Sequence, residues 1–70
     1  MIELEKNNRE VIRINKNLYK EKEYVDLRVF YKDKQSGTML PSRKGVSIAL
    51  EKFKALMKGL CDFSDAEGLS

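Results

Sequence analysis

The alternation of apolar and polar residues predicts strands along most of the first 48 positions. Residues 9–15 alternate, with Ile12 and Ile14 on one face, which is the pattern of a half-buried strand. The polar run at 15–17 predicts a bend directly after this strand, because Asn favours turns. Residues 2–5 alternate more weakly and indicate a short strand that precedes it or forms an edge.

A longer strand is predicted over residues 24–32. Its core-facing set is Val25, Leu27, Val29 and Tyr31, and the opposite set is Tyr24, Asp26, Arg28, Phe30 and Lys32. Strict alternation therefore places Arg28 and Tyr31 on opposite faces of the sheet. One ligand can contact both only through a bulge, a strong twist, or different regions of the surface. For Phe30, packing in a core or an interface is favoured over contact with a ligand.

A hairpin and a last strand are predicted to follow. Residues 33–38 form a polar stretch of hairpin length that contains Gly37. The chain resumes at Met39, and Pro41 is confined to an edge or a bulge because it has no N–H to donate. The final strand is expected over residues 43–48.

Apolar residues at helical spacing predict an amphipathic helix over residues 49–60 or beyond. They are Leu50, Phe53, Leu56, Met57 and Leu60. Gly59 weakens the prediction for the last turn, and residues 64–70 either extend the helix or fray. Four strands followed by one helix make an α+β fold in a single domain, residues 1–70. One helix cannot cover a whole sheet, so we expect a dimer.

The composition is that of a small globular protein. The chain has 70 residues, of which 41% are hydrophobic and 36% are charged. No apolar run approaches the roughly 20 residues of a membrane span, and the acidic start at 1–5 is unlike a signal peptide. We therefore expect an intracellular protein with no membrane partner.

Catalytic and metal sites are not predicted. The chain has no His and one Cys, which rules out an internal disulfide and disfavours a zinc site. Cys61 lies in the helical pattern with no base available, which favours packing over a nucleophilic role. Asp26 and Asp33 have neither a His nor a Gly-rich phosphate loop nearby, and Asp26 is expected to pair with a neighbouring cation. We expect no enzyme activity and no cofactor.

Positive charge is concentrated in the predicted sheet. The whole chain has a net charge of +3, but residues 6–44 contain eleven Lys and Arg against five Asp and Glu, a net charge of +6. Residues 45–70 contain three Lys and four acidic residues. This asymmetry suits a polyanion on the sheet, although charged strands can also simply resist edge-to-edge aggregation.

The block RKGVSI at residues 43–48 joins two cations to a glycine. Glycine lets a phosphate or another strand approach the backbone closely, and Arg and Lys neutralise phosphate. Together with YVDLRVFYKD at 24–33 and the helix start at 50–56, this block resembles the single-stranded-DNA-binding domain of the transcriptional positive cofactor four family. The resemblance covers roughly half of the chain.

The resemblance implies a fold and a function. The expected fold is a homodimer of curved antiparallel sheets that form a saddle, with the C-terminal helices at the subunit interface. The expected function is non-enzymatic binding of single-stranded or melted DNA with little sequence preference, and RNA stays open as a ligand. Transcription, replication, recombination or repair would be the process, with transcription or replication machinery as further partners.

The resemblance also implies which residues bind nucleic acid. They are Tyr19, Lys20, Lys22, Arg28, Tyr31, Arg43 and Lys44. Tyr31 would stack on a base, and either Leu18 or Tyr19 aligns with the family's loop aromatic. The family commonly has Trp where Tyr31 stands, and Glu21 and Glu23 lower the positive potential of the loop. Core packing beside Leu27 and Val29 is an equal alternative for Tyr31.

A rival interpretation is a small dimeric protein-interaction module. Its helix or edge strand would dock another protein, and its lysines would only maintain solubility. Eukaryotic members of the family carry a Ser-rich region before this domain that the sequence lacks, which favours a prokaryotic or viral source. The protein would then lie in the cytoplasm or nucleoid, or in the nucleus if the source is eukaryotic.

Overall fold

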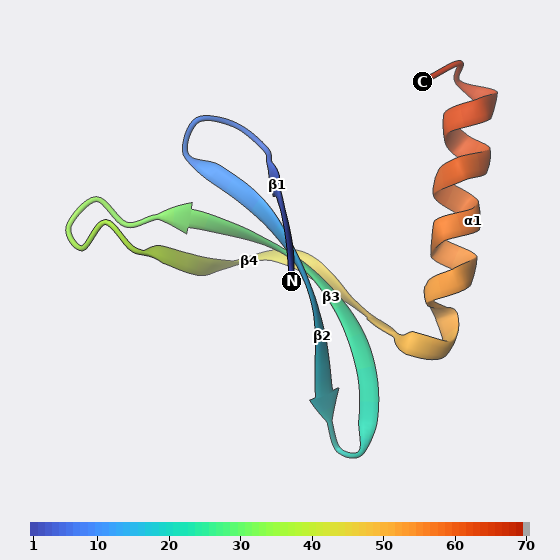
Figure 1. Cartoon of the computed structure of the whole chain (residues 1–70), viewed down its shortest axis with the longest axis horizontal. Helices are drawn as coiled ribbons and strands as arrows, with labels where there is room; N and C mark the ends of the chain where they lie inside the picture. The colour runs from blue at the N-terminus through green and yellow to red at the C-terminus, as the bar shows by residue number, and fades with distance from the viewer. Residues whose placement is uncertain (70) are drawn as a thin grey trace.

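The fold is a four-stranded sheet followed by one helix. A computed structural model describes residues 1–69. The elements are β1 (Ile2–Glu5), β2 (Glu10–Tyr19), β3 (Lys22–Lys32), β4 (Met39–Ala49) and α1 (Leu50–Ala66). The strands lie in the order β1-β2-β3-β4, and every neighbouring pair is antiparallel (Figure 1). The predicted order of four strands and one helix is confirmed.

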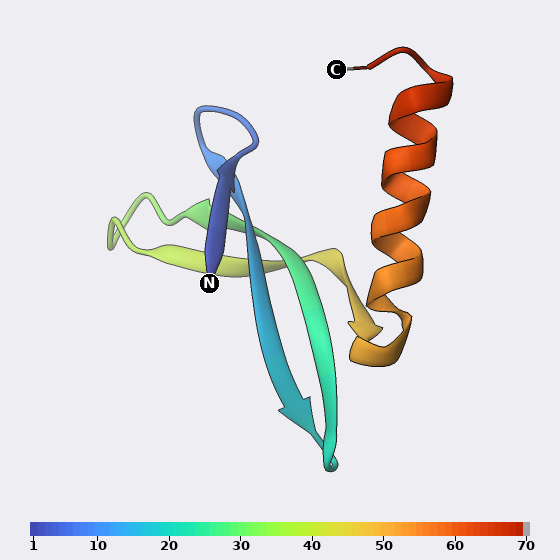
Figure 2. The same cartoon turned by 45° about the vertical axis from the view of Figure 1, so that its right-hand side comes forward.

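The sheet is open and strongly curved, and the helix stands beside it. In Figure 1 the β2–β3 hairpin points down and the β3–β4 hairpin points to the left, so β3 changes direction along its length. α1 leaves the end of β4 and extends away from the strands in both views (Figures 1 and 2). It contacts only β3 and β4. The helix therefore leaves much of the sheet without a cover.

Strand register separates an apolar face of the sheet from a polar face. The apolar face carries Ile12, Ile14, Val25, Leu27, Val29, Val46 and Ile48, in which Ile12 pairs with Val29 and Ile14 with Leu27. The more polar face carries Arg13, Asn15, Asn17, Tyr19, Lys22, Asp26, Arg28 and Ser47, together with Val11, Tyr24 and Phe30. The faces predicted for the second and third strands are confirmed.

The core of this chain is very small. Val25 and Val29, at 6% and 9% exposure, are the only buried side chains among the described residues. Tyr31, which was one of the residues predicted to face the core, is 40% exposed, so core packing is wrong for it. Tyr31 lies near the end of β3, where its ring borders an open hollow rather than the buried valines.

The bend predicted at residues 15–17 is wrong, because β2 continues to Tyr19. Asn15 pairs with Asp26 and Asn17 with Tyr24, so the partner strand supplies the hydrogen bonds that a turn would have supplied. The Lys16 Nζ atom also lies 3.7 Å from the Glu23 carboxylate across the strand pair. Cross-strand pairing has overridden the local preference of Asn for turns.

The turn between β2 and β3 consists of Lys20 and Glu21, with φ angles of 50° and 65°. A two-residue hairpin turn of this hand requires positive φ at both positions, where Asn and Gly are the favoured residues. A side chain with a Cβ atom costs about 1–2 kcal/mol in this conformation. The hairpin therefore carries local strain at two exposed charged residues.

The helix extends beyond Leu60, as the prediction allowed, and continues past Gly59 to Ala66. Phe53 and Leu56 are half-buried, but Met57, Leu60 and Phe63 are 44%, 56% and 58% exposed. Cys61, which was expected to pack, is exposed as well, because no other part of residues 1–69 covers that part of the helix. In the described chain no helix is long and apolar enough to cross a membrane. Ser70, in the tail predicted to extend or fray, lies outside the described residues.

Glu21→Gly is expected to raise the free energy of unfolding by about 1 kcal/mol, because glycine adopts positive φ without a Cβ clash. Urea denaturation at equal protein concentrations would measure the change. Gln35→Gly, in a turn residue without positive φ, is the control and should give no gain. Equal effects of the two substitutions would contradict strain at Glu21.

Candidate nucleic-acid interface

The cations of this chain divide into those held in ion pairs and those left open. Of fourteen Lys and Arg residues, five form ion pairs, namely Lys6, Arg13, Lys16, Arg28 and Lys58. Within residues 1–69 no ion pair involves Arg9, Lys20, Lys22, Lys32, Lys34, Arg43, Lys44, Lys52 or Lys54. All but the last two lie on the strands and loops of the sheet, so that region has most of the charge available to an anion.

The tip of the β2–β3 hairpin combines an aromatic ring with two open cations. Tyr19 is 62% exposed, and the Lys20 Nζ atom lies 5.4 Å from the centre of its ring. Tyr19 pairs with Lys22 and shares the polar face with it, whereas Leu18 pairs with Glu23 on the other face. The register therefore favours Tyr19 over Leu18 as the loop aromatic.

Arg28 is engaged within the protein. Its Nε and Nη2 atoms donate to the two carboxylate oxygens of Asp26 at 3.2 and 3.1 Å, and its Nη1 atom donates to the Ser42 carbonyl at 3.3 Å. The hydrogen bonds and charge of Asp26 raise the pKa of Arg28 further above its ordinary value. The expectation that Asp26 pairs with a neighbouring cation is confirmed. Arg28 retains two of its five N–H groups for a ligand.

A bulge in β4 presents Arg43 and Lys44. Arg28 pairs with Gly45 and Phe30 with Pro41. Three residues of β4, at positions 42–44, therefore stand opposite the single residue Val29 of β3. The Ser42 hydroxyl donates to the Val29 carbonyl at 2.8 Å and accepts from the Lys44 N–H at 3.1 Å. These bonds fix the irregular segment that carries both cations, and Pro41 lies beside a bulge in an edge strand as predicted. β4 begins at Met39, four residues before the predicted strand.

Gly45 is required by the neighbouring strand. A Cβ atom at this position would lie 2.5 Å from the Leu27 carbonyl oxygen and 3.0 Å from the Arg28 Cα atom. Both are backbone atoms that cannot move aside independently of the sheet. The sequence offered two reasons for a glycine here, the close approach of a phosphate or of a strand. The structure supports the close approach of a strand.

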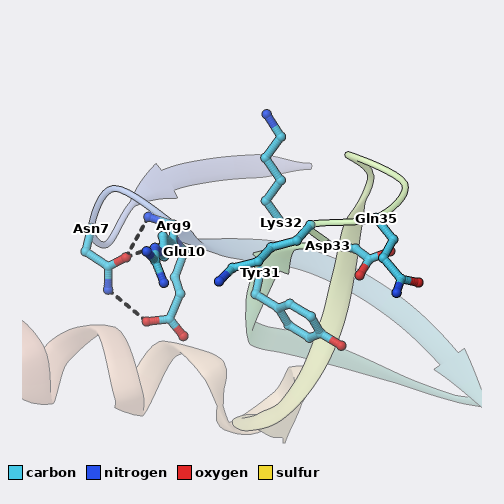
Figure 3. A pocket seen from close by; sticks show the side chains of 8 residues that line it. Asn7, Arg9, Glu10, Tyr31, Lys32, Asp33 and Gln35 are labelled. Carbon is cyan, nitrogen blue, oxygen red and sulfur yellow. Dashed lines mark hydrogen bonds between the residues drawn. The ribbon is translucent and has the colours of Figure 1, made fainter.

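Tyr31 lies at the opposite end of β3 from Tyr19. It lines an open hollow of about 600 Å³ together with residues of the β1–β2 loop and the β3–β4 turn (Figure 3). In Figure 3 its ring projects to the same side as Glu10, its partner on β2, and Lys32 projects to the other side. The β2–β3 register is continuous over the whole strand pair, so Arg28 and Tyr31 remain on opposite faces. The structure does not bring all seven predicted residues onto one face.

Arg9 and Lys34 were missed as site candidates, although both line the hollow beside Tyr31. Neither lies in the segments that carry the family resemblance most strongly. Antiparallel pairing could have located Arg9, because Glu10 stands opposite Tyr31 once β2 and β3 are aligned. Lys34 could be located only from the geometry of the β3–β4 turn, which the sequence does not give.

The family described as Transcriptional Coactivator p15 (PC4) matches residues 6–59. The chain belongs to the PC4 family. The match includes β2, β3, β4 and the first part of α1, and so contains every residue discussed above as a candidate. PC4 proteins are a non-enzymatic family of DNA-binding coactivators. Membership in this family confirms the expectation of no enzyme activity.

Solved structures of a PC4 homolog from Burkholderia pseudomallei are similar to this chain over nearly its whole length. Its orthorhombic and tetragonal crystal forms match with TM-scores of 0.82 and 0.81, both at 31% sequence identity. Each comparison covers 91% of this chain, and 85% and 93% of the respective homolog chains. The curved sheet followed by a helix is therefore the fold of the family.

A Caenorhabditis elegans protein named "Putative RNA polymerase II transcriptional coactivator" is 52% identical over 31 residues. Those residues are 44% of this chain and 25% of the nematode protein. The similar segment thus spans about a quarter of that relative's length.

Gly45→Ala is expected to lower the free energy of unfolding by about 1–3 kcal/mol, because the added methyl group meets backbone atoms of β3. Chemical denaturation would measure the loss. Gly59→Ala is the matched control, since its Cβ meets no atom within 4 Å and alanine favours a helix by about 1 kcal/mol. If Gly45→Ala were as stable as Gly59→Ala, the close approach of β4 to β3 would be refuted.

Proposed function

We propose that this PC4-family protein binds single-stranded or locally melted DNA, with little sequence preference, as a homodimer. The observation that carries the proposal is the coincidence of open cations with exposed tyrosines on one small sheet. Tyr19 lies beside Lys20 and Lys22, and Tyr31 lies beside open cations at the other end of β3. Cations that track the backbone and aromatic faces on which bases stack are the two parts of a single-strand site.

Strand state, rather than sequence, would decide what binds. A single strand can follow a curved surface and turn its bases toward aromatic rings, whereas a duplex must first pay for unpairing. Arg28 has committed its fork to Asp26 and is not free to read a base edge, and Arg43 is proposed to contact phosphate, which carries no sequence information. RNA shares the backbone and bases and is a second ligand to test.

The dimer is proposed from the apolar surface that one subunit leaves open. Two buried valines make a core too small for a stable 70-residue domain. Met57, Leu60 and Phe63 form an exposed apolar stripe along α1. A second copy that covers this stripe would remove it from water at about 25 cal/mol per Å² of apolar surface.

A role in transcription is supported by the family description and by the name of the nematode relative. Transcription machinery is then the natural protein partner, and the site of action is the nucleus in a eukaryote or the nucleoid in a prokaryote. Replication, recombination and repair also expose single strands and stay within the proposal.

The protein is expected to bind an oligonucleotide more tightly as a single strand than as a duplex of equal length. Its affinity should fall with salt at a log–log slope of about −0.7 for each neutralised phosphate. Fluorescence anisotropy over a salt series would measure both quantities. Equal affinity for the two forms, or an affinity insensitive to salt, would contradict the proposed function.

Replacing Arg43 and Lys44 together by Ala should weaken binding to every sequence and reduce the salt slope by about 1.4, because two phosphate contacts are lost. Lys52 and Lys54 replaced together by Ala are the control, since these helix lysines also form no ion pair and the net charge changes equally. Full affinity in the folded Arg43/Lys44 variant would exclude the bulge from the binding surface.

The protein should sediment at micromolar concentration with twice its 8.1 kDa mass. Leu60→Glu places a charge in the apolar stripe and should shift the population toward monomer or unfolded chain. Analytical ultracentrifugation measures the distribution, and Lys54→Glu, outside the stripe, is the control. A stable wild-type monomer that still binds DNA would reject the dimer.

A further inference from the structure

Two loops that are distant in sequence meet at the Tyr31 end of the sheet. The Lys32 N–H donates to the Arg9 carbonyl at 3.2 Å, which ties the β1–β2 loop to the end of β3. The β3–β4 turn begins at the next residue, where the Asp33 N–H donates to the Thr38 carbonyl at 2.8 Å. The two loops therefore lie together at the end of β3 and border the hollow drawn in Figure 3.

The hollow at this edge has the size of a small-molecule site. It measures about 600 Å³ and adjoins a smaller hollow of about 250 Å³. Arg9, Lys32, Asp33 and Lys34 line both. A volume of several hundred Å³ accommodates a ligand such as a nucleotide. The Tyr31 ring supplies an apolar wall to the larger hollow only.

Both carboxylates of the hollow are engaged by their own loops. Glu10 accepts from Asn7 at 2.8 Å and from Lys6 at 3.0 Å, and these bonds hold its pKa below the ordinary value. Asp33 accepts from the Ser36 hydroxyl at 2.7 Å, which lowers the pKa of Asp33 in the same way. Both groups stay ionised at neutral pH without pairing with Arg9 or Lys34.

The loop that carries Arg9 is fixed by a side chain. The side-chain amide oxygen of Asn7, Oδ1, accepts from the backbone N–H groups of Arg9 and Glu10, both at 2.9 Å (Figure 3). Such a turn holds the backbone at Arg9 without help from a ligand. Lys34 is placed similarly by the Asp33–Ser36 bonds of the next loop. Two cations on ordered backbones thus flank one tyrosine.

We infer that Tyr31, Arg9 and Lys34 form a binding site for one nucleotide of a single strand, with the base on the Tyr31 ring and the adjoining phosphates between Arg9 and Lys34. The inference rests on the proposed function and assigns to it two residues of the β1–β2 loop and the β3–β4 turn. A stacked base contributes through its π face and a phosphate through its charge, so the site accepts any base.

This site gives each subunit a second point of attachment. Tyr19 stands opposite Lys22, and Tyr31 lies nine positions after Lys22 on β3, a distance of about 30 Å along an extended strand. Tyr19 shares the polar face with Lys22 whereas Tyr31 lies on the opposite face, so a single strand that contacts both must follow the bend of β3 from one face of the sheet to the other. The bulge cations Arg43 and Lys44 lie on the neighbouring strand between these ends.

The test compares two double variants of equal charge, Arg9→Gln with Lys34→Gln and Lys52→Gln with Lys54→Gln. All four residues are exposed, so both proteins should fold. The probe is a labelled oligothymidylate. The Arg9/Lys34 variant should bind about tenfold more weakly, with a salt slope reduced by about 1.4, and the helix variant should match the wild type.

A second measurement reports on the ring itself. The chain has no Trp, so Tyr31→Trp introduces the only indole, and a base stacked on it should change its fluorescence. The change should be lost when Arg9→Gln and Lys34→Gln are added. If wild-type protein binds the probe but the two double variants behave alike and the indole does not respond, the site is refuted and the proposed function stands. If the wild type does not bind at all, both fail.

Discussion

The close approach of β4 to β3 at Gly45 is the constraint on which the binding surface depends. The backbones lie so near that a single methyl group would meet the Leu27 carbonyl oxygen. The contact can be accommodated because β4 bulges just before it, and the Ser42 hydroxyl and the Arg28 guanidinium supply the hydrogen bonds that the bulge removes from the ladder. Arg28 therefore acts first as a support of the fold.

The cations of the sheet divide in the same way into those bonded within the protein and those open to a ligand. Arg13 illustrates the first kind: it pairs with Glu3 at 2.8 Å and lies over the Phe30 ring at 4.6 Å. Lys20 and Arg43 illustrate the second, since they stand at a hairpin tip and in a bulge. Arg13 and Arg28, near the middle of the sheet, thus support strand pairing, while the cations at the hairpin tip and in the bulge retain their charge for an anion.

Sequence periodicity was enough to predict the strand faces, because a period of two survives even in a strongly curved sheet. It could not predict that Asn15 and Asn17 would stay extended, since their partners lie on another strand. It also misjudged Tyr31 and Cys61, whose apolar positions imply packing only if another element covers them. Family resemblance supplied the candidate residues, but only the meeting of two loops places Arg9 beside one of them, Tyr31.

The account as a whole depends on where a single strand touches the protein. An NMR titration of the ¹⁵N-labelled protein with oligothymidylate measures this directly, residue by residue. We predict amide shift changes at the β2–β3 turn, in the β4 bulge and around Tyr31, and none at Lys52 and Lys54 on the outer side of α1. Changes confined to the helix, or no changes at a saturating concentration of the oligonucleotide, would contradict the account.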